Sequence, residues 1–370
     1  MPRKSRPGAA RKAETRRLAA RGDFLRLAYA WALLAAAVCF AFALWTPRAK
    51  ARTRVLKPVF APAGGAEALD NAAGASRVRL AAYNTCNFTD GKGDGPERTG
   101  ALAAAHAEGV AEILDAVGAD IAVLEEVENA SMLPLLRDRL EKPFAFAYAT
   151  RLRRASGRRD KLNLALLCRF PPEEVREISF AGLDYGDARP TRGALFARFD
   201  LGEGKKLAVY GVHLKSNFGD TPRNQAERTI ALAAVAADAA AERMRLAGSG
   251  EALSVVVMGD FNTDPDNEEF ADDPSLSPLA GGFRDLWRGR PLEERTTIPT
   301  RRGGAPGSGF PPACFDRVFA SDDLCGDGPW RIGSPQALAR GVATEEGGAL
   351  PGEDGHVSDH YAVFADLIRE

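Results

Sequence analysis

Five short segments of the chain place polar or ionisable side chains directly after an apolar run. They are Asn84, Glu125-Glu126, His213-Leu214-Lys215-Ser216, Gly259-Asp260-Phe261-Asn262 and Ser358-Asp359-His360. Together they supply carboxylates for a hard cation with oxygen ligands, two imidazoles for proton transfer or phosphate contact, and amides for positioning. This set of groups indicates hydrolysis of a phosphate ester.

Each segment taken alone also has an ordinary structural explanation. Glu126 can cap the following turn, and His213 can be a buried histidine with satisfied hydrogen bonds. Asp260 and Asn262 can form an Asx turn. It is the joint occurrence of the segments that favours a catalytic site.

The elements that must position these residues alternate between apolar runs and helical stretches. Strands are predicted at 78–84, 120–126, 164–170, 193–199, 206–214, 253–261, 315–321 and 360–367, and helices at 99–117 and 222–246. The pattern is that of a mixed α/β domain, in which sites are commonly built where strands end.

The motifs and their order resemble those of the endonuclease/exonuclease/phosphatase superfamily. They are RLAAYN with Asn84, ADIAVLEEVEN with Glu126, VHLKS with His213, VVMGDFNTD with Asp260 and Asn262, CFDRVFAS with Asp316, and VSDHYAV with Asp359 and His360. The resemblance covers roughly residues 78–370. It implies an α/β four-layered sandwich of two packed β-sheets flanked by helices, with the site at one edge of both sheets.

The resemblance also implies a cofactor, Mg²⁺ or Mn²⁺. It makes Glu126 the principal ligand, with Asn84 beside it and Asp359 near the ion. All three side chains offer oxygen, and the five cysteines show no spacing suited to zinc.

The remaining motif residues carry catalytic roles by the same resemblance. Asp260 and Asn262 position the attacking water and the phosphate, with Asp260 a candidate base. His360, oriented by Asp316 or Asp359, contacts the phosphate or moves a proton, as does His213. Which histidine is acid and which is base stays open.

Two positions depart from the family pattern. Glu125 stands where Gln is usual, and this second acid is expected to raise the local negative charge and favour metal binding. Cys86 stands where exonuclease III-like enzymes carry Asp, which disfavours an abasic-site endonuclease.

Two groups of basic residues are candidates for binding the substrate. Arg189 and Arg192 precede the strand at 193–199 and are expected to reach a substrate phosphate, with a structural ion pair as the alternative. The basic loop at 151–161 can grip nucleic-acid phosphates or anionic head groups, with a merely solvated loop as the alternative.

The N-terminal part differs sharply in charge from the rest. Residues 1–57 hold fourteen Lys and Arg against two acids, a net +12, which leaves −13 for residues 58–370. A basic segment at 1–26 precedes an uncharged run at 27–45, which as a helix measures about 28 Å and matches a bilayer core. Residues 46–77 are expected to form a flexible linker, and 78–370 the catalytic domain.

The charge bias predicts a single-pass transmembrane helix with a cytoplasmic N-terminus and the catalytic domain outside the cytoplasm. A cleaved signal at Ala49-Lys50-Ala51, giving a secreted protein, is the main alternative. A buried helix of the soluble domain is the other.

These observations predict a Mg²⁺-dependent phosphoric ester hydrolase that acts on phosphodiester bonds, with a nuclease favoured. The alternative is a phosphatase, or a phospholipase C- or sphingomyelinase-like enzyme acting on membrane-derived phosphoesters. A non-catalytic binding domain is the third possibility, disfavoured by the complete set of acids, amides and histidines. The expected partners are nucleic acid or another phosphodiester, and the membrane through the N-terminal helix. No protein partner is inferred.

Overall fold

The computed structural model describes residues 51–62, 72–92, 98–153, 156–183, 188–299, 311–343 and 349–370. The described residues all belong to one compact unit that begins at Ala49. The predicted membrane helix at 27–45 and the basic segment before it lie outside the described residues. Within these ranges, no helix has both the length and the apolar character needed to cross a bilayer.

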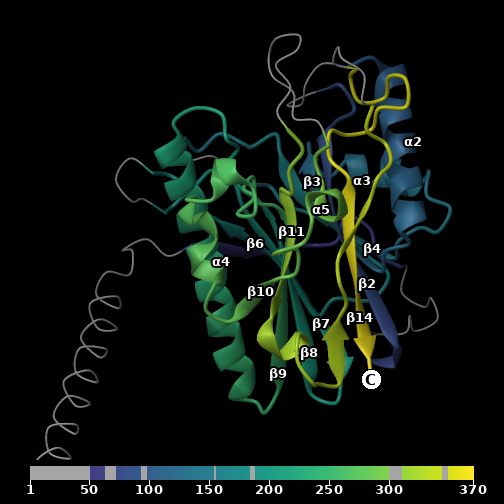
Figure 1. Ribbon diagram of the computed structural model, residues 1–370. Helices are drawn as coiled ribbons and strands as arrows, with labels where there is room; N and C mark the ends of the chain where they lie inside the picture. The colour runs from purple at the N-terminus through teal and green to yellow at the C-terminus, as the bar shows by residue number, and fades with distance from the viewer. Residues whose placement is uncertain are drawn as a thin grey trace, which may run out of the picture. The chain divides into compact units, whose positions relative to one another are not determined.

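The unit is built on two mixed β-sheets (Figure 1). The strands of the first sheet are, in spatial order, β1 (Arg52–Val55), β6 (Glu174–Ser179), β7 (Gly193–Gly202), β8 (Lys205–His213), β9 (Ala252–Asp260), β11 (Asp316–Ser321) and β10 (Phe283–Asp285). The strands of the second are β12 (Trp330–Ile332), β14 (Ala362–Arg369), β2 (Arg77–Phe88), β3 (Ile121–Val127), β5 (Asn163–Cys168) and β4 (Phe146–Ala149), with β13 (Gln336–Leu338) also paired to β14. Each sheet contains one parallel pair, β8 with β9 and β2 with β3.

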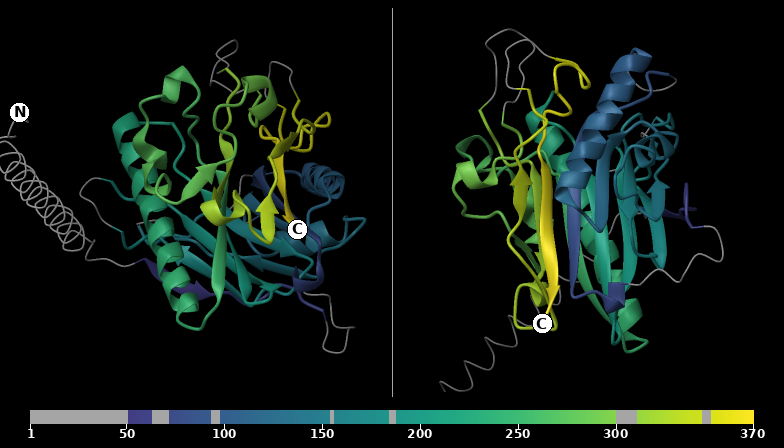
Figure 2. Two further views of the ribbon diagram at one scale, coloured as in Figure 1. Left: turned by 60° about the horizontal axis from the view of Figure 1, so that its bottom comes forward. Right: turned by 90° about the vertical axis from the view of Figure 1, so that its right-hand side faces the viewer.

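Helices cover the outer faces of both sheets (Figures 1 and 2). The long helix α4 (Thr221–Ala247) packs on the first sheet, and α2 (Gly100–Val117) and α3 (Met132–Arg137) pack on the second. Thr99 caps α2 by accepting a hydrogen bond from the Leu102 amide, and Gly118 ends it with a left-handed φ of 64°. The layers are therefore helix, sheet, sheet and helices, as the resemblance implied. A short helix, α5 (Leu292–Arg295), and four 3₁₀ turns (Ala72–Gly74, Glu268–Phe270, Pro274–Leu279 and Asp322–Leu324) lie in the connections.

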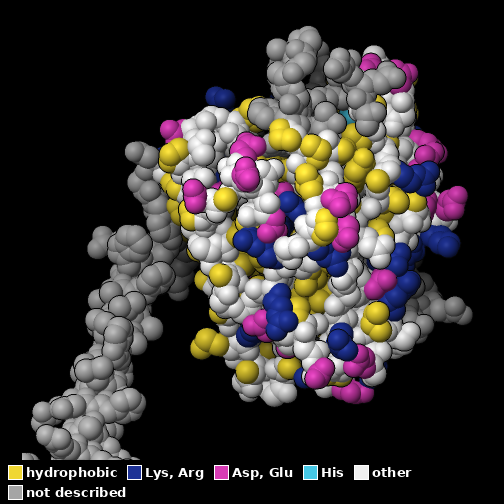
Figure 3. Space-filling model, viewed as in Figure 1, with side chains coloured by type: hydrophobic (Ala, Val, Ile, Leu, Met, Phe, Trp, Pro, Cys, Tyr) yellow, Lys and Arg dark blue, Asp and Glu magenta, His cyan; other side chains and the backbone are white. Residues whose placement is uncertain are grey.

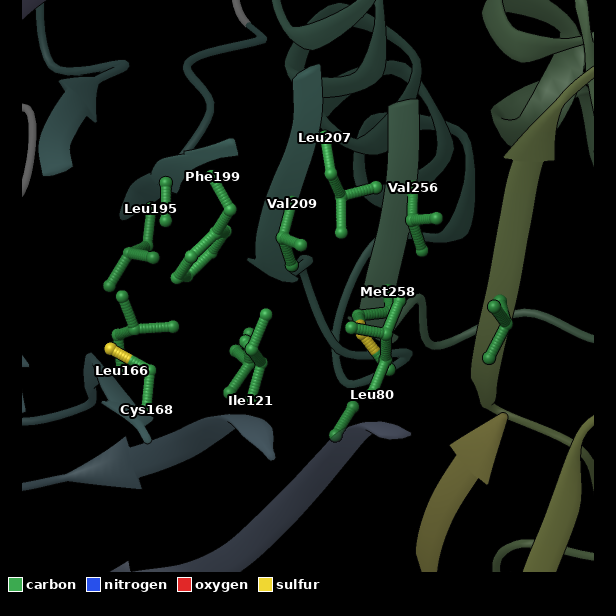
Figure 4. Packing of buried hydrophobic residues seen from close by; sticks show 14 of the residues in the cluster. Leu80, Ile121, Leu166, Cys168, Leu195, Phe199, Leu207, Val209, Val256 and Met258 are labelled. Carbon is green, nitrogen blue, oxygen red and sulfur yellow. The ribbon is translucent and has the colours of Figure 1, made fainter. Parts of the chain in front are cut away.

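The main core lies between the two sheets. Alternate residues of each central strand point inward, so that Leu195, Phe199 and Val209 of the first sheet face Leu80, Ile121 and Leu166 of the second (Figure 4). These apolar side chains are removed from water, and this burial is the main force that holds the sheets together.

The predicted elements that carry the motifs are all present, with bounds within a few residues of those expected. The segment predicted to be a flexible linker differs from that expectation. Residues 46–77 were expected to be flexible, yet Arg52–Val55 pairs with β6, and Leu56 is buried in the core between the sheets. The Val59 amide donates to Ala147 O at 2.7 Å, so the segment after β1 also reaches the second sheet.

Gly211 marks a point of close approach between the sheets. It lies in β8, and a Cβ added there would stand 2.5 Å from Cγ1 of Val123 in β3. Because both backbones belong to the packed sheets, neither residue can move away freely. The spacing of the two sheets thus depends on the absence of a side chain at Gly211.

We predict that Gly211→Ala lowers the free energy of unfolding by about 1–3 kcal/mol, the usual cost of an overpacked core. Val123→Ala removes the methyl group that the new Cβ would meet. The double variant is therefore expected to be more stable than the sum of the single effects by at least about 0.5 kcal/mol. Urea denaturation of the four proteins measures this coupling.

Gly281→Ala is the matched control, because a Cβ at Gly281 meets nothing within 4 Å. Its effect is expected to stay within about ±0.5 kcal/mol. Strict additivity of the Gly211 and Val123 effects would contradict the close-contact explanation.

Candidate active site

The strands bring the predicted site residues to one edge of both sheets. His213 ends β8 and Asp260 ends β9, and these two residues are paired in register. Asp316 begins β11 on the other side of Asp260, also paired with it. From the second sheet, β2 contributes Asn84 and β3 contributes Glu126.

Asp260 is the most highly connected of these side chains. Its Oδ1 accepts a hydrogen bond from the Asn262 amide at 2.8 Å, and its Oδ2 accepts from Asn262 Nδ2 at 2.9 Å and from Asn84 Nδ2 at 3.2 Å. His213 Nε2 lies 3.4 Å from Oδ2. The carboxylate is thus fixed by groups from both sheets.

Gly259 explains the first position of the GDFN motif. Its φ is 132°, and a Cβ there would stand 2.1 Å from Val212 O and 2.7 Å from Glu125 Oε1. A side chain at this point would clash with backbone that cannot move. Glycine is therefore required for β9 to deliver Asp260 to the site.

Glu126 is turned towards the site by an irregularity in β3. Its φ is 61°, and the register with β5 shifts between Leu124 and Val127. A non-glycine residue with positive φ is uncommon, and such residues cluster at functional sites. Glu126 Oε2 accepts from the Asn87 amide at 2.8 Å, and Oε1 lies 3.7 Å from His213 Nε2.

Glu125 behaves differently from what we expected. It is fully buried next to Gly259, and neither carboxyl oxygen has a hydrogen-bond partner among the described residues. Burial, reinforced by Asp316 and Asp260, holds the pKa of Glu125 well above its ordinary value. The expectation that it adds negative charge for a metal therefore fails, because the neutral acid is the form favoured in this buried position.

His360 is held by Asp316. Its Nδ1 lies 2.8 Å from Asp316 Oδ2, whereas Asp359 Oδ1 lies 3.9 Å from Nε2. Of the two acids considered from the sequence, Asp316 is the one that orients the ring. Burial disfavours the charged imidazole, but Asp316 and Asp359 outweigh it and raise the pKa of His360 well above its usual value.

Burial also shifts the pKa values of three further groups at the centre, in each case towards the neutral form. It raises the pKa of Glu126, although Arg192 opposes the shift. Burial, with Arg192 and His360 nearby, lowers the pKa of His213 well below its ordinary value, so this imidazole is neutral. Burial raises the pKa of Asp260 to about 7, although His360 opposes the shift. The pKa values of the two histidines thus shift in opposite directions, which favours the cation at His360 and the neutral ring at His213.

The predicted metal ligands offer a suitable set of donors. Glu126 and Asp359 supply carboxylates and Asn84 supplies an amide oxygen, which accepts from the Cys86 amide at 3.1 Å. The described residues contain no group of three or more His, Cys, Asp or Glu placed to hold a metal. These oxygen donors nevertheless fit a hard divalent cation that is bound through one or two carboxylates and keeps several waters.

Of the two predicted substrate arginines, Arg192 contacts the protein backbone through Nη1. Its Nη1 donates to His213 O at 3.2 Å and to Leu214 O at 2.8 Å, so it braces the end of β8. Arg189 is exposed. Arg192 also acts electrostatically on Glu126, His213 and Asp260, so it lies close to the site. Contact of either arginine with a substrate phosphate stays a prediction.

Two supporting residues, Ser358 and Asp264, were given no role from the sequence. Ser358 Oγ donates to Asn84 O at 2.6 Å and accepts from the His360 amide at 3.0 Å, so one hydroxyl joins the ends of two motifs. Asp264 is fully buried and accepts from Arg295 and Arg317 behind the site. Ser358 lies in the motif VSDHYAV and Asp264 in VVMGDFNTD. Their position inside these motifs is the sequence feature that could have indicated a supporting role.

Solved structures share this architecture. TDP2 from D. rerio, in a complex with a single-strand DNA product, is 19% identical with a TM-score of 0.52 and matches 79% of this chain and 99% of its own. A mannosyl-6-phosphatase from Bacteroides thetaiotaomicron is 19% identical with a TM-score of 0.50, over 79% of this chain and 99% of its own. At such identities the likeness shows the fold. No curated relative matches the sequence significantly.

The family model described as "Endonuclease/Exonuclease/phosphatase family" matches residues 81–360, which is most of the 370-residue chain. The matched span runs from β2 to His360 and so includes the whole cluster described above. The chain therefore belongs to the endonuclease/exonuclease/phosphatase family.

Proposed function

We propose that this protein is a phosphodiesterase that depends on a divalent metal ion and cleaves nucleic acid. The observation that carries the proposal is the convergence of Glu126, Asp260 and the Asp316-held His360 at one edge of two sheets. These groups meet the needs of phosphate-ester hydrolysis, namely a cation site, a proton acceptor and a proton donor.

Glu126, Asp359 and Asn84 would hold the metal, for which Mg²⁺ or Mn²⁺ fits the all-oxygen donors. When bound, such an ion polarises the phosphoryl oxygen and offsets the charge that develops on it.

Asp260 accepts the proton of the attacking water in this proposal. Its two oxygens are fixed by Asn262 and Asn84, and its raised pKa gives it a proton affinity near that of a base working at neutral pH. Asn262, with a φ of 53°, holds its amide against the carboxylate and leaves little freedom for rotation. Proton acceptance therefore takes place at a carboxylate whose orientation is set before substrate binds.

His360 donates a hydrogen bond from Nε2 to a phosphate oxygen. Because Asp316 takes Nδ1, the second ring nitrogen is the one left to face the substrate. Its positive charge stabilises the additional negative charge of the transition state. Because its pKa is lowered, His213 is a weak proton acceptor, and its Nε2, 3.4 Å from Asp260 Oδ2, can instead donate a hydrogen bond to that carboxylate.

The fold relatives support both a nuclease and a phosphatase. The TDP2 structure with a single-strand DNA product favours the first, and the mannosyl-6-phosphatase favours the second. A phosphatase or lipid phosphodiesterase acting on membrane-derived substrates is therefore our second candidate. The uncharged run at 27–45, with its basic N-terminal flank, supports a further proposal that the domain is tethered to a membrane, outside the cytoplasm.

Metal removal is the first test. Excess EDTA is expected to abolish hydrolysis of bis(4-nitrophenyl) phosphate and of DNA, and added Mg²⁺ or Mn²⁺ to restore it, because the ion would offset the charge that develops on the phosphoryl oxygen. Zn²⁺ serves as the comparison ion. Full activity in excess chelator would rule out the metal-dependent mechanism.

The second test separates catalysis from folding. His360→Ala and Asp316→Asn are each expected to lower kcat by at least about 10²-fold, because one removes the donor and the other its orienting carboxylate. Because each change breaks a buried charged pair, the melting temperature is expected to fall, but both variants are expected to be folded at the assay temperature, so that kcat is compared between folded proteins. The two measurements are steady-state kinetics and melting by circular dichroism.

His106→Leu is the control for this pair, because His106 is a buried histidine of α2 that packs edge-on against Phe88. It is expected to leave kcat per folded molecule unchanged. If His360→Ala keeps most of its activity while its melting temperature collapses, the ring is structural.

The third test concerns location. A reporter that is active only outside the cytoplasm is expected to function when fused after Glu370, and the protein is expected to sediment with membranes. The expectation follows from the uncharged run and the excess of Lys and Arg before it. Recovery of the intact protein wholly in the cytoplasmic fraction would reject both the anchor and the cleaved signal.

A further inference from the structure

A cleft of about 350 Å³ lies where β1, β6 and the segment after β4 meet. Its walls carry four arginines, two from β1 and two from the segment after β4, with one acid from β6. The residues are Arg52, Arg54, Arg151, Arg153 and Glu177. We call this the arginine cleft.

The arginine cleft is strongly cationic in an acidic domain. The unit from Ala49 to Glu370 carries −9, because Lys50, Arg52, Arg54 and Lys57 add four positive charges to the −13 of residues 58–370. Within it, the four guanidinium groups of the cleft face a single carboxylate. On the face shown in Figure 3, by contrast, Lys and Arg side chains lie interspersed with Asp and Glu. The cleft is thus a cationic site for an anion, and it is continuous in sequence with the basic loop at 151–161.

Glu177 organises the arginine cleft more than it neutralises it. Its Oε2 accepts from Arg54 Nη2 at 2.9 Å and also from the backbone amide of Arg151. The Glu177 side chain is 8% exposed, whereas that of Arg54 is 48% exposed. The buried Glu177 carboxylate therefore links β1 to the segment after β4. The guanidinium groups of the cleft remain exposed at the surface.

The strand register places the cleft in the same row as the catalytic residues. Arg52 pairs with Ser179 of β6, and Ser179 pairs with Gly193 of β7. In the antiparallel pair of β7 and β8, Ala194 pairs with Val212. Gly193, one residue before Ala194, therefore lies opposite His213, one residue after Val212.

From His213 the row continues to Asp260 and then to Asp316. Adjacent strands lie about 4.8 Å apart, so Arg52 stands three strands, or about 14 Å, from His213 along the edge of the sheet. The arginine cleft and the active site therefore open at the same edge.

We propose that the arginine cleft binds a second phosphate of the substrate while the first is cleaved at the active site. Planar guanidinium groups bind phosphate through paired hydrogen bonds, which suits a site with several arginines. The substrate class is then a single-stranded oligonucleotide. The cleft holds a phosphate about four nucleotides from the scissile bond if the strand is stacked with a 3.4 Å rise, and fewer if it is extended. The inference rests on the proposed phosphodiesterase function.

Kinetics of the full-length chain with substrates of increasing length test the inference. The variant Arg52→Gln/Arg153→Gln removes one charge from each wall of the arginine cleft. It is expected to lower kcat/KM for an octanucleotide about tenfold, mainly through KM. Hydrolysis of bis(4-nitrophenyl) phosphate and of a dinucleotide is expected to change less than about twofold, since neither reaches the cleft.

Arg158→Gln/Arg159→Gln is the matched control, because it removes the same charge from exposed positions of the same loop that do not line the cleft. It is expected to leave octanucleotide kinetics near those of the parent. Equal losses in both variants would overturn the inference in favour of general electrostatic attraction.

A binding measurement keeps the test independent of the activity. Fluorescence anisotropy of a labelled octanucleotide in EDTA, repeated over a range of salt, should give a shallower slope for the cleft variant, by about 0.7 for each lost phosphate contact on a single strand. The control variant should keep the parent's slope.

Failure of the two proposals can be told apart. If the parent binds the octanucleotide through the arginine cleft but cleaves no diester, the proposed phosphodiesterase function is wrong, whereas the inference that the cleft binds a phosphate is supported. If the parent cleaves the small diester and the cleft variant treats the octanucleotide like the parent, the cleft inference fails. Loss of binding to phosphatidylserine vesicles in the cleft variant, with unchanged oligonucleotide kinetics, would also overturn it and make the cleft a membrane contact.

Discussion

The hydrogen bond from Asn84 Nδ2 to Asp260 Oδ2 joins the two sheets at the edge where their central strands end. A single bond of this kind contributes only about 1 kcal/mol, so it cannot hold the sheets together. Its importance is geometric, because it forms only when the apolar core sets the sheets at the right separation. The spacing at Gly211 and Val123 and the turn at Gly259 are conditions for the same contact.

The polar groups of the site are supported by buried charges behind it. Arg317 is fully buried between Asp264 and Asp285, and Asp264 also accepts from Arg295. Removing one member of such a network costs about 3–5 kcal/mol, because the remaining charge is left unpaired in a dry environment. This network fixes the start of β11, and with it Asp316 and the ring of His360.

The sequence allowed the fold and the position of the site to be predicted because the polar motifs follow long apolar strands. Asp260 and His213 could be placed at strand ends for this reason. The short strand β1 could not be predicted from the sequence. Arg52–Val55 is largely polar and wholly exposed, so its pattern does not distinguish it from a linker. The different environments of Glu125 and Glu126 were equally hidden, because they arise from one positive φ angle in β3. The pairing of His360 with Asp316 depends on two chain segments meeting in space, for which the sequence offered two equivalent acids.

The strand β1 also protects the first sheet. It forms one margin of that sheet, and its partner β6 has buried apolar residues at Val175 and Ile178. An open sheet margin with apolar side chains is a template for pairing with another chain and for aggregation, and charged side chains on the outermost strand are a common defence. Arg52 and Arg54 lie on that outermost strand. If residues 46–77 are taken for a linker, a shortened protein would begin at Ser76. Such a protein would lack β1, so the backbone edge of β6 would be exposed and open to pairing with another chain.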